Sequence, residues 1–349
     1  KLSKQKLNDI ITYGIVIAAF VIMQILINAG EISSLFQGLM VPLCTYIILA
    51  ISLNLVVGIL GELSLGHAGF MCVGAFTSSF FSKAMQDTIT NSTVRFLLAL
   101  LIGIITAAIF GIIIGIPVLR LNGDYLAIVT LAFGEIIKNL VNVLFIGKDS
   151  KGFHFSTKDA VSLNMEPDGK IILNGPQGIT GTPNDSTFFI GFILILVTLF
   201  IVLNLIHSRD GRAIMAIRDN RIAAESIGIN ITKYKLMTFT ISAAMAGAAG
   251  VLYAHNLSNL TANTNNFGYN MSINILVFVV LGGIGNIRGS IIAAVVLTLL
   301  PELLRGMSDY RMLIYAIVLI VMMLFNWAPK AIEWREKHLS FKKNKKEAA

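Results

Sequence analysis

The stretch RDGRAIMAIRDNRIAAESIGINITKYK, residues 209–235, is a charged segment between two long apolar runs. It holds six Lys or Arg and three Asp or Glu, and such a basic excess keeps a short loop on the cytoplasmic side of a membrane. The runs on either side, 187–206 and 236–255, are long enough for membrane-spanning helices. The pattern predicts an integral membrane protein with a cytoplasmic loop at 207–235.

A short helix is predicted inside this loop. Asp219 or Asn220 can accept a hydrogen bond at the helix N-terminus, and Gly228 can end the helix in the left-handed conformation. One face of the helix would carry small or apolar side chains, namely Ala223, Ala224 and Ile227. A helix with such a face fits a cleft in a partner protein. We therefore predict a docking helix at the membrane surface.

The composition excludes an ordinary soluble protein. Of the 349 residues, 55% are hydrophobic and 13% are charged, whereas soluble domains are about 25% charged. The net charge of +8 comes from bases beside apolar runs, which indicates membrane topology rather than nucleic-acid binding. The two cysteines, Cys44 and Cys72, both lie in apolar runs, so neither a disulfide framework nor a metal site is predicted.

Apolar windows predict the transmembrane architecture. The expected spans are 10–29, 37–60, 64–82, 96–118, 125–146, 187–206, 236–255, 271–286, 289–304 and 312–328. An even number of spans places both termini on one side, and most of the 27 Lys and Arg mark that side as cytoplasmic. Residues 64–82 are either a full span or re-entrant, and 271–304 are either two spans or one broken element. The predicted fold is all-α, a polytopic bundle of about ten transmembrane helices with broken or re-entrant segments.

The domain organisation follows from the loops. The whole chain, 1–349, is expected to form one transmembrane domain. The polar stretch 147–186 is predicted to form an external loop or small cap, with a flexible loop as the open alternative. Residues 329–349 are a basic segment and are predicted to be a cytoplasmic tail.

The fourth predicted span carries small residues at a spacing of four, at Gly103, Ala107, Gly111 and Gly115. Small residues on one face let helices approach closely in lipid. This face is therefore predicted to serve helix packing rather than ligand binding.

Two glycine-rich interruptions, residues 58–69 and 282–289, lie at membrane depth. A helix that is broken inside a bilayer must face protein or a water-filled path, and its exposed backbone groups and dipole ends can bind a zwitterion. The alternative is a tight turn between spans. Candidate residues of a translocation path in these breaks are Ser64, Gly66, His67, Gly282, Gly283 and Asn286.

Polar side chains inside spans give further candidates for the path. Glu135 lies in the fifth span with Lys138 three residues later, and Asn54 lies in the second. Ionisable groups at such depth are functional candidates by default. Glu135 and Lys138 are alternatively a structural ion pair, and His67 is alternatively a hydrogen-bonded structural residue rather than a proton-transfer group.

Catalytic motifs are absent from the sequence. GKDSKG does not have the spacing of a Walker A loop, and no other stretch does. Neither a G-x-S-x-G elbow nor an H-E-x-x-H pair occurs. We predict that this chain is not an enzyme and binds no metal or cofactor itself.

Five segments in the same order resemble the inner-membrane permease subunits of bacterial ABC importers for branched-chain amino acids. They are ELSLGHAGFMCVGAF (62–76), GDYLAIVTLAFGEIIKNL (123–140), GRAIMAIRDNRIAAESIGINITKYK (211–235), SAAMAGAAGVLYA (242–254) and LGGIGNIRGSIIAAVVLTLLPELLR (281–305). The resemblance covers about residues 37–327. Ser290 stands where many relatives have proline, so the chain after Gly289 departs from the family pattern.

The resemblance implies a multi-pass protein of the bacterial inner membrane. Its implied partners are a second homologous permease, two ATPase subunits that bind ATP and Mg, and an external substrate-binding protein. Leucine, isoleucine and valine are the expected substrates, although similar permeases serve urea and short amides. Residues of the loop would then couple the chain to the ATPase, namely Arg212, Arg218, Asp219, Asn220, Ala223, Ala224 and Gly228.

Two other functions are consistent with parts of the sequence. An ion-coupled secondary transporter of small amino acids, urea or amides would use Glu135 or His67 as its coupling group and the two breaks as its substrate site. That alternative leaves the docking loop unexplained. A purely structural membrane scaffold leaves the intramembrane charges and the breaks unexplained.

Overall fold

The computed structural model describes residues 4–30, 34–119, 124–167, 169–304 and 310–327. The predicted tail at 329–349 lies outside these residues. The longer helices are α1 (Lys4–Asn28), α2 (Ser34–Asn54), α3 (His67–Ala84), α4 (Ser92–Val118), α5 (Asp124–Val143), α6 (Phe188–His207) and α9 (Ile231–Ala254). The shorter helices are α7 (Arg209–Asp219), α8 (Arg221–Ser226), α10 (Thr264–Phe267), α11 (Tyr269–Gly282), α12 (Ile287–Leu303) and α13 (Arg311–Trp327).

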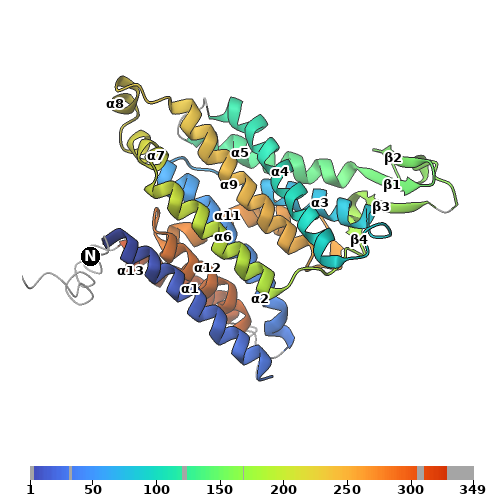
Figure 1. The fold of residues 1–349 in the computed structure, drawn as a ribbon, viewed down its shortest axis with the longest axis horizontal. Coiled ribbons are helices and arrows are strands. Elements are labelled where there is room, and N and C mark those ends of the chain that lie inside the picture. The colour runs from blue at the N-terminus through green and yellow to red at the C-terminus, as the bar shows by residue number, and fades with distance from the viewer. Residues whose placement is uncertain (1–3, 31–33, 120–123, 168, 305–309, 328–349) are drawn as a thin grey trace, which may run out of the picture.

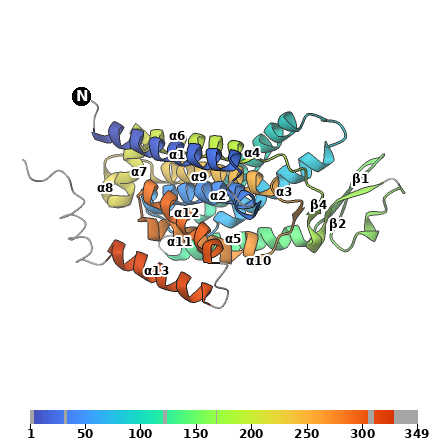
Figure 2. The ribbon, with the colours of Figure 1, turned by 90° about the horizontal axis from the view of Figure 1, so that it is seen from below.

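The long helices run side by side, with α7 and α8 at one end of the bundle and the strands β1, β2 and β3 at the other (Figure 1). Seen from below, α1 and α6 lie along one side and α13 along the other, with α2 and α9 between them (Figure 2). The two segments of greatest sequence interest, the charged loop and the polar stretch 147–186, therefore lie at opposite ends of the molecule.

Six helices of the described chain are long and apolar enough to cross a membrane. They span Asp9–Asn28, Phe36–Leu60, Ser92–Val118, Tyr125–Val143, Phe188–His207 and Ile231–Ala254. The predicted helical membrane protein is confirmed, but the count of about ten spans is not. Helix α3 contains His67, Lys83 and several serines and glycines, which lower its hydropathy, and α11, α12 and α13 are only 14, 17 and 17 residues long.

Helix α9 forms the centre of the bundle, because most of its residues are buried and it packs against α2, α3 and α4. A Cβ atom on Gly74 of α3 would lie 2.3 Å from the carbonyl oxygen of Gly247 in α9, so the two backbones are in direct contact. The predicted small face of α4 is also confirmed. All four of its members are buried against α9 or its neighbours, namely Gly103, Ala107, Gly111 and Gly115.

The opposite face of α4 carries large apolar side chains on the surface. They are Leu97, Leu98, Leu101, Ile105, Ile109, Ile112, Ile113 and Ile116. An apolar surface of this size is unfavourable in water but matches a lipid environment. The small residues of α4 thus face the protein, and its large apolar residues face the lipid.

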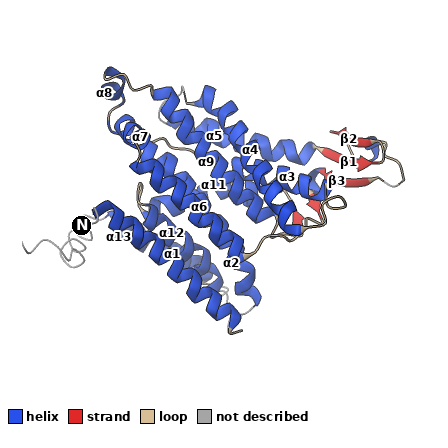
Figure 3. Ribbon diagram, viewed as in Figure 1, coloured by secondary structure: helices blue, strands red, loops and turns tan. Residues whose placement is uncertain are grey.

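Short strands correct the all-α prediction (Figure 3). Strands β1 (Phe145–Asp149), β2 (Gly152–Ser156) and β3 (Lys170–Asn174) form an antiparallel sheet in the order β2-β1-β3. Strands β4 (Ile179–Thr180) and β5 (Asn259–Leu260) pair antiparallel beside it. The stretch 147–186, which was predicted to form an external loop or small cap, therefore belongs to a sheet that begins at Phe145, and this sheet brings buried apolar side chains such as Leu173 against the end of the helical bundle.

One carboxylate organises the turn between β1 and β2. Asp149 accepts hydrogen bonds from the backbone N–H groups of Lys151 at 2.8 Å, Gly152 at 3.1 Å and Glu166 at 3.3 Å, and its carboxylate lies 2.9 Å from Nε2 of His154. Removal from water raises the pKa of Asp149, but the hydrogen bonds from Lys151, Glu166 and His154 outweigh this effect and hold the pKa below its usual value. Asp149 is thus fully committed to the turn.

Candidate functional site

The two glycine-rich breaks, more than 200 residues apart in the chain, meet in space. After α2 the chain continues as a π-helix, Leu55–Leu60, all of whose residues are buried. A Cβ atom on Gly58 would lie 2.3 Å from the backbone nitrogen of Gly285 in the second break. A π-helical turn often marks a functional site, and here it provides the close approach between the breaks.

Asn54 bridges the two breaks. Its Oδ1 accepts a hydrogen bond from the backbone N–H of Gly285 at 2.9 Å, and its Nδ2 donates to the hydroxyl of Ser290 at 2.8 Å. Asn54 and Ser290 are both completely buried. At position 290, where many relatives have proline, the serine hydroxyl accepts a hydrogen bond that a proline side chain cannot accept.

The second break is a tight turn between α11 and α12, which is the alternative interpretation that the sequence left open. Gly283 and Gly285 have φ angles of +95° and +81°, a region that favours glycine. Asn286 caps α12 by accepting a bond from the N–H of Gly289 at 3.3 Å. Gly282 is equally restricted, since a Cβ atom there would lie 2.3 Å from the nitrogen of Ser290. A role for these residues in a path stays a prediction.

His67 begins α3 and is buried. Its Nε2 lies 2.8 Å from the hydroxyl of Ser242, and that hydroxyl donates to the carbonyl oxygen of Ser52 at 2.5 Å. Because the serine proton is used in this way, Nε2 of His67 is the donor to Ser242. Its Nδ1 has no hydrogen-bond partner among the described residues. The histidine thus joins α3 to α9 and α2 beside the first break.

Ser64 and Gly66 shape the N-terminal approach to α3. The hydroxyl of Ser64 accepts a bond from the N–H of Gly66 at 3.5 Å, and the N–H of Leu65 donates to Thr130 of α5 at 3.0 Å. A Cβ atom on Gly66 would lie 2.7 Å from the carbonyl oxygen of Thr130. Backbone groups that the break removes from helical bonding are therefore bound by side chains of neighbouring helices, as a membrane interior requires.

Glu135 forms the ion pair with Lys138 that the sequence left as the structural alternative. Its Oε1 also accepts a bond from the N–H of Tyr269 at 2.8 Å, while Lys138 donates to Thr264 at 3.2 Å. The pair therefore joins α5 to the start of α11. Since α11 leads into the second break, Glu135 is connected to the site through that helix and not by direct contact with Asn54.

The charged loop reaches the first break. Nη1 of Arg218, in the last turn of α7, donates to the carbonyl oxygen of Gly58 at 3.0 Å. The same side chain packs over Gly61, where an added Cβ atom would lie 2.5 Å from Cγ of Arg218. At the other end of the loop, Lys235 forms an ion pair with Glu62. These links were not predicted, because the sequence alone does not show which polar groups of the break face the loop.

The docking segment forms two helices rather than one. Ser208 caps α7 through the N–H of Gly211 at 3.0 Å, and Asn220 caps α8 through the N–H of Ala223 at 3.0 Å. Of the two predicted caps, Asn220 is the one used. Asp219 instead pairs with Arg218 at 2.9 Å, and Gly228 ends the segment with a φ of +86°.

The predicted face of α8 is wrong in one respect. Ala224 is buried under the helix, where it packs with Ile217 and Ile231, so it holds α8 onto the protein. Ile222 and Ile227 are 80% and 74% exposed, and Ala223 and Arg212 are exposed as well. Only one face of the six-residue helix α8 packs against the rest of the protein, and Ala224 lies on that face. The larger apolar residues Ile222 and Ile227 face outward.

Comparison with known proteins identifies the family to which this chain belongs. Residues 34–325 match a family described as "Branched-chain amino acid transport system / permease component". The match covers α2 through most of α13 and includes both breaks and the loop. The chain belongs to this family.

Individual relatives in this permease family differ in their named substrates. The chain is 35% identical to the high-affinity branched-chain amino acid transport system permease protein LivM of Escherichia coli (strain K12), over 82% of this chain and 67% of LivM. It is 26% identical to LivH of Salmonella typhimurium, over 80% and 89% of the two chains. It is 25% identical to the fructose import permease protein FruG of Bifidobacterium longum, over 95% and 94%. No solved structure matches the chain.

Asn54→Leu should lower the thermal stability of this permease, because it removes the acceptor for the part-buried N–H of Gly285 and the donor to the buried hydroxyl of Ser290. An unsatisfied buried polar group costs about 1–3 kcal/mol. Ser290→Ala should have a smaller effect, since it removes the bond from Asn54 and the longer 3.3 Å bond to the carbonyl oxygen of Asn286 but leaves the bond between Asn54 and Gly285. Melting curves of the detergent-purified variants measure both effects, and an Asn54→Leu protein as stable as wild type would contradict the bridging role.

Proposed function

We propose that this chain is a translocation-pathway subunit of an ATP-driven ABC importer for branched-chain amino acids. The observation that carries the proposal is the connection from α8 to the breaks. The charged loop contains a capped surface helix with an exposed isoleucine, Ile222, and a second one directly after it, Ile227, and Arg218 of the same loop binds the backbone of the first break. An ion-coupled carrier has no need for such a connection.

In this proposal α8 docks in a cleft of an ATPase subunit, with Ile222 and Ile227 as its apolar contacts. ATP, with Mg, is bound and hydrolysed by two such subunits, and this chain binds no cofactor itself. Movement of α8 and α7 would pass through Arg218 to Gly58. Because Gly58 touches Gly285 and both breaks share Asn54, the breaks would move together and alternate the access of the path.

The substrate and the remaining partners are inferred from the relatives. LivM and LivH are named as permeases for branched-chain amino acids, so leucine, isoleucine and valine are the proposed substrates. The relation to both proteins supports pairing with a second homologous permease. The fructose permease FruG indicates that the family scaffold serves more than one substrate, which fits selection of the substrate by an external binding protein.

If α8 docks on the ATPase, substitutions of its exposed apolar residues should weaken assembly with the ATPase and leave the folding of this chain unchanged. Ile222→Asp together with Ile227→Asp should weaken binding of the ATPase subunits about thirty-fold, since an apolar hot spot contributes about 2 kcal/mol or more. Both side chains are exposed, so the chain itself should fold normally. Val161→Asp, at a position 84% exposed in the opposite end of the molecule, is the matched control.

The measurement is co-purification of ATPase subunits with the tagged permease in mild detergent, together with leucine uptake at constant ATP. Wild type and Val161→Asp should retain the ATPase. Equal retention by the double variant would exclude α8 as the docking helix. Uptake that a protonophore abolishes at constant ATP would support the ion-coupled carrier instead.

We further propose ten membrane crossings, in which α3, α11, α12 and α13 cross in addition to the six long apolar helices. Their polar and short character is acceptable where they are enclosed by the bundle or its partners. Both termini are then cytoplasmic in the inner membrane, the loop at 207–235 faces the ATPase, and the segment 147–186 faces the external binding protein.

Single-cysteine labelling with a membrane-impermeant maleimide tests this topology, after Cys44 and Cys72 are replaced. Val161→Cys should be labelled in intact cells, while Ile222→Cys should be labelled only after permeabilisation. Labelling of both positions from the same side would contradict the topology.

We also propose that the path runs beside the two breaks and that Glu135 lines it. Glu135→Lys combined with Lys138→Glu retains an ion pair between the same positions but loses the acceptor for the N–H of Tyr269, so its thermal stability should lie above that of Glu135→Lys alone and below the wild-type value. Uptake should remain low, because the charge facing the path is reversed. If the exchange restored both stability and uptake, Glu135 would be a structural residue only.

A further inference from the structure

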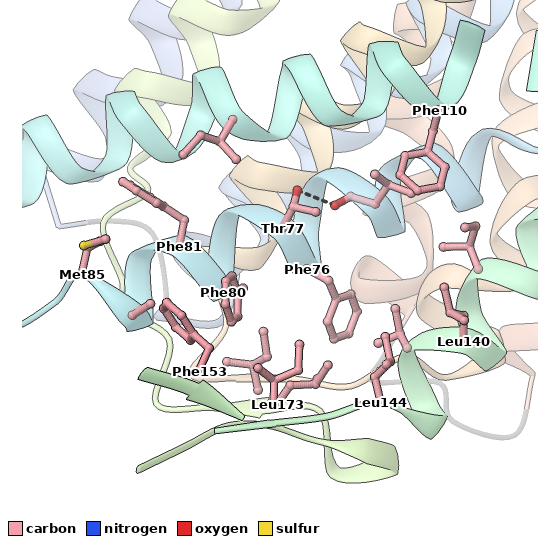
Figure 4. A pocket seen from close by; sticks show the side chains of 17 residues that line it. Phe76, Thr77, Phe80, Phe81, Met85, Phe110, Leu140, Leu144, Phe153 and Leu173 are labelled. Carbon is pink, nitrogen blue, oxygen red and sulfur yellow. Dashed lines mark hydrogen bonds between the residues drawn. The ribbon is translucent and has the colours of Figure 1, made fainter. Parts of the chain in front are cut away.

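A half-enclosed cavity of about 490 Å³ lies where α3, α4 and α5 meet the strands. Figure 4 shows its walls, which include Phe76, Phe80 and Phe110 from the helices and Phe153 and Leu173 from the sheet. Cavities of about 300–1,000 Å³ are the size at which proteins bind small ligands. This cavity is separate from the contact between the two breaks, because none of the break residues line it.

The cavity has almost no capacity for polar binding. Thr77 is the one polar side chain that lines it, and its hydroxyl already bonds to the carbonyl oxygen of Val73 at 2.7 Å and to Thr106 at 2.9 Å. A free amino acid would bring an ammonium and a carboxylate into this space without partners, and each unpaired buried charge is strongly unfavourable. The walls therefore suit a hydrocarbon chain and not the zwitterionic substrate.

A second, polar hollow of about 280 Å³ adjoins the apolar one and shares Ala84 with it. Three lysines line the hollow, Lys83 at the end of α3, Lys148 on β1 and Lys170 on β3. The ammonium of Lys148 also lies 5.8 Å from the ring centroid of Phe153 in the wall of the apolar cavity. Positive charge and apolar surface are thus joined at one place.

The hydrogen bonds of Lys83 and Lys148 leave N–H donors that can bind an anion. Lys83 donates to the carbonyl oxygen of Thr180 at 2.7 Å and Lys148 to that of Ala84 at 2.9 Å, whereas an ammonium group has three N–H donors. The hollow also contains two carboxylates. Asp87 pairs with Lys170 at 3.0 Å, and Asp149 is committed to its turn.

We propose that the two hollows together bind an anionic phospholipid, with an acyl chain in the apolar cavity and the phosphate headgroup at Lys83 and Lys148. Lysine ammonium groups form charge-assisted hydrogen bonds with phosphate oxygens, and lysines near the end of a span lie at headgroup level. The lipid fills the space between the helical bundle and the sheet. It thereby seals and stiffens the junction through which the sheet is attached.

The test uses the full chain reconstituted in nanodiscs with equal amounts of phosphatidylglycerol and phosphatidylcholine. After mild detergent extraction, native mass spectrometry counts the lipids that remain bound. Wild type should retain phosphatidylglycerol preferentially. Lys83→Gln with Lys148→Gln should reduce this preference about ten-fold, whereas Lys151→Gln, at an exposed lysine outside both hollows, should leave it unchanged.

A second pair of variants tests the acyl-chain site and does not alter any charge. Leu140 lines the cavity and is 52% exposed, while Ile136 is one turn earlier on α5, is 64% exposed and does not line it. Leu140→Trp should reduce the bound lipid, and Ile136→Trp should not. Equal retention of both lipids by wild type, or an unchanged preference in both the lysine and the Leu140 variants, would overturn the proposal. Neither result depends on transport activity.

Discussion

The buried amide of Asn54 holds the centre of this protein together. A membrane interior offers no water to backbone groups that leave the helical hydrogen-bonding pattern, so each must find a partner within the protein. Asn54 provides that partner for Gly285 and at the same time bonds to Ser290. Two chain breaks that would each be unfavourable alone thereby become one shared structure.

Close helix packing is the condition for this arrangement. The backbones of α3, α4 and α9 touch through small residues such as Gly74, Gly103 and Gly247, which brings α3 and its preceding break against the centre of the bundle. Thr130, Ser242 and Ser272 then reach the start of α3 from three different helices. The break is therefore held from several sides, and Arg218 of α7 connects it to the charged loop.

Sequence reasoning was reliable where a property is local. It identified the helical membrane protein, the family, the small face of α4 and the capping asparagine and glycine around α8. It was wrong or incomplete where partners decide the outcome. The count of about ten spans was not confirmed, because α3 is more polar than the six long apolar helices and α11, α12 and α13 are shorter than they are. The sheet at 145–174 was missed, since each strand has only five residues and gains its stability from pairing and from the bundle beneath it.

The sequence by itself determined the lipid environment, the charged loop and the location of both glycine-rich breaks, because apolar content, charge and glycine act through local physical preferences. Only the tertiary structure decided that the breaks meet at Gly58 and Gly285, that Glu135 is paired, and that Ala224 faces inward while Ile222 and Ile227 face outward. These outcomes depend on which groups, distant in the sequence, form hydrogen bonds or ion pairs with the buried polar groups of the backbone and side chains. That choice is made by packing between helices, which no single segment encodes.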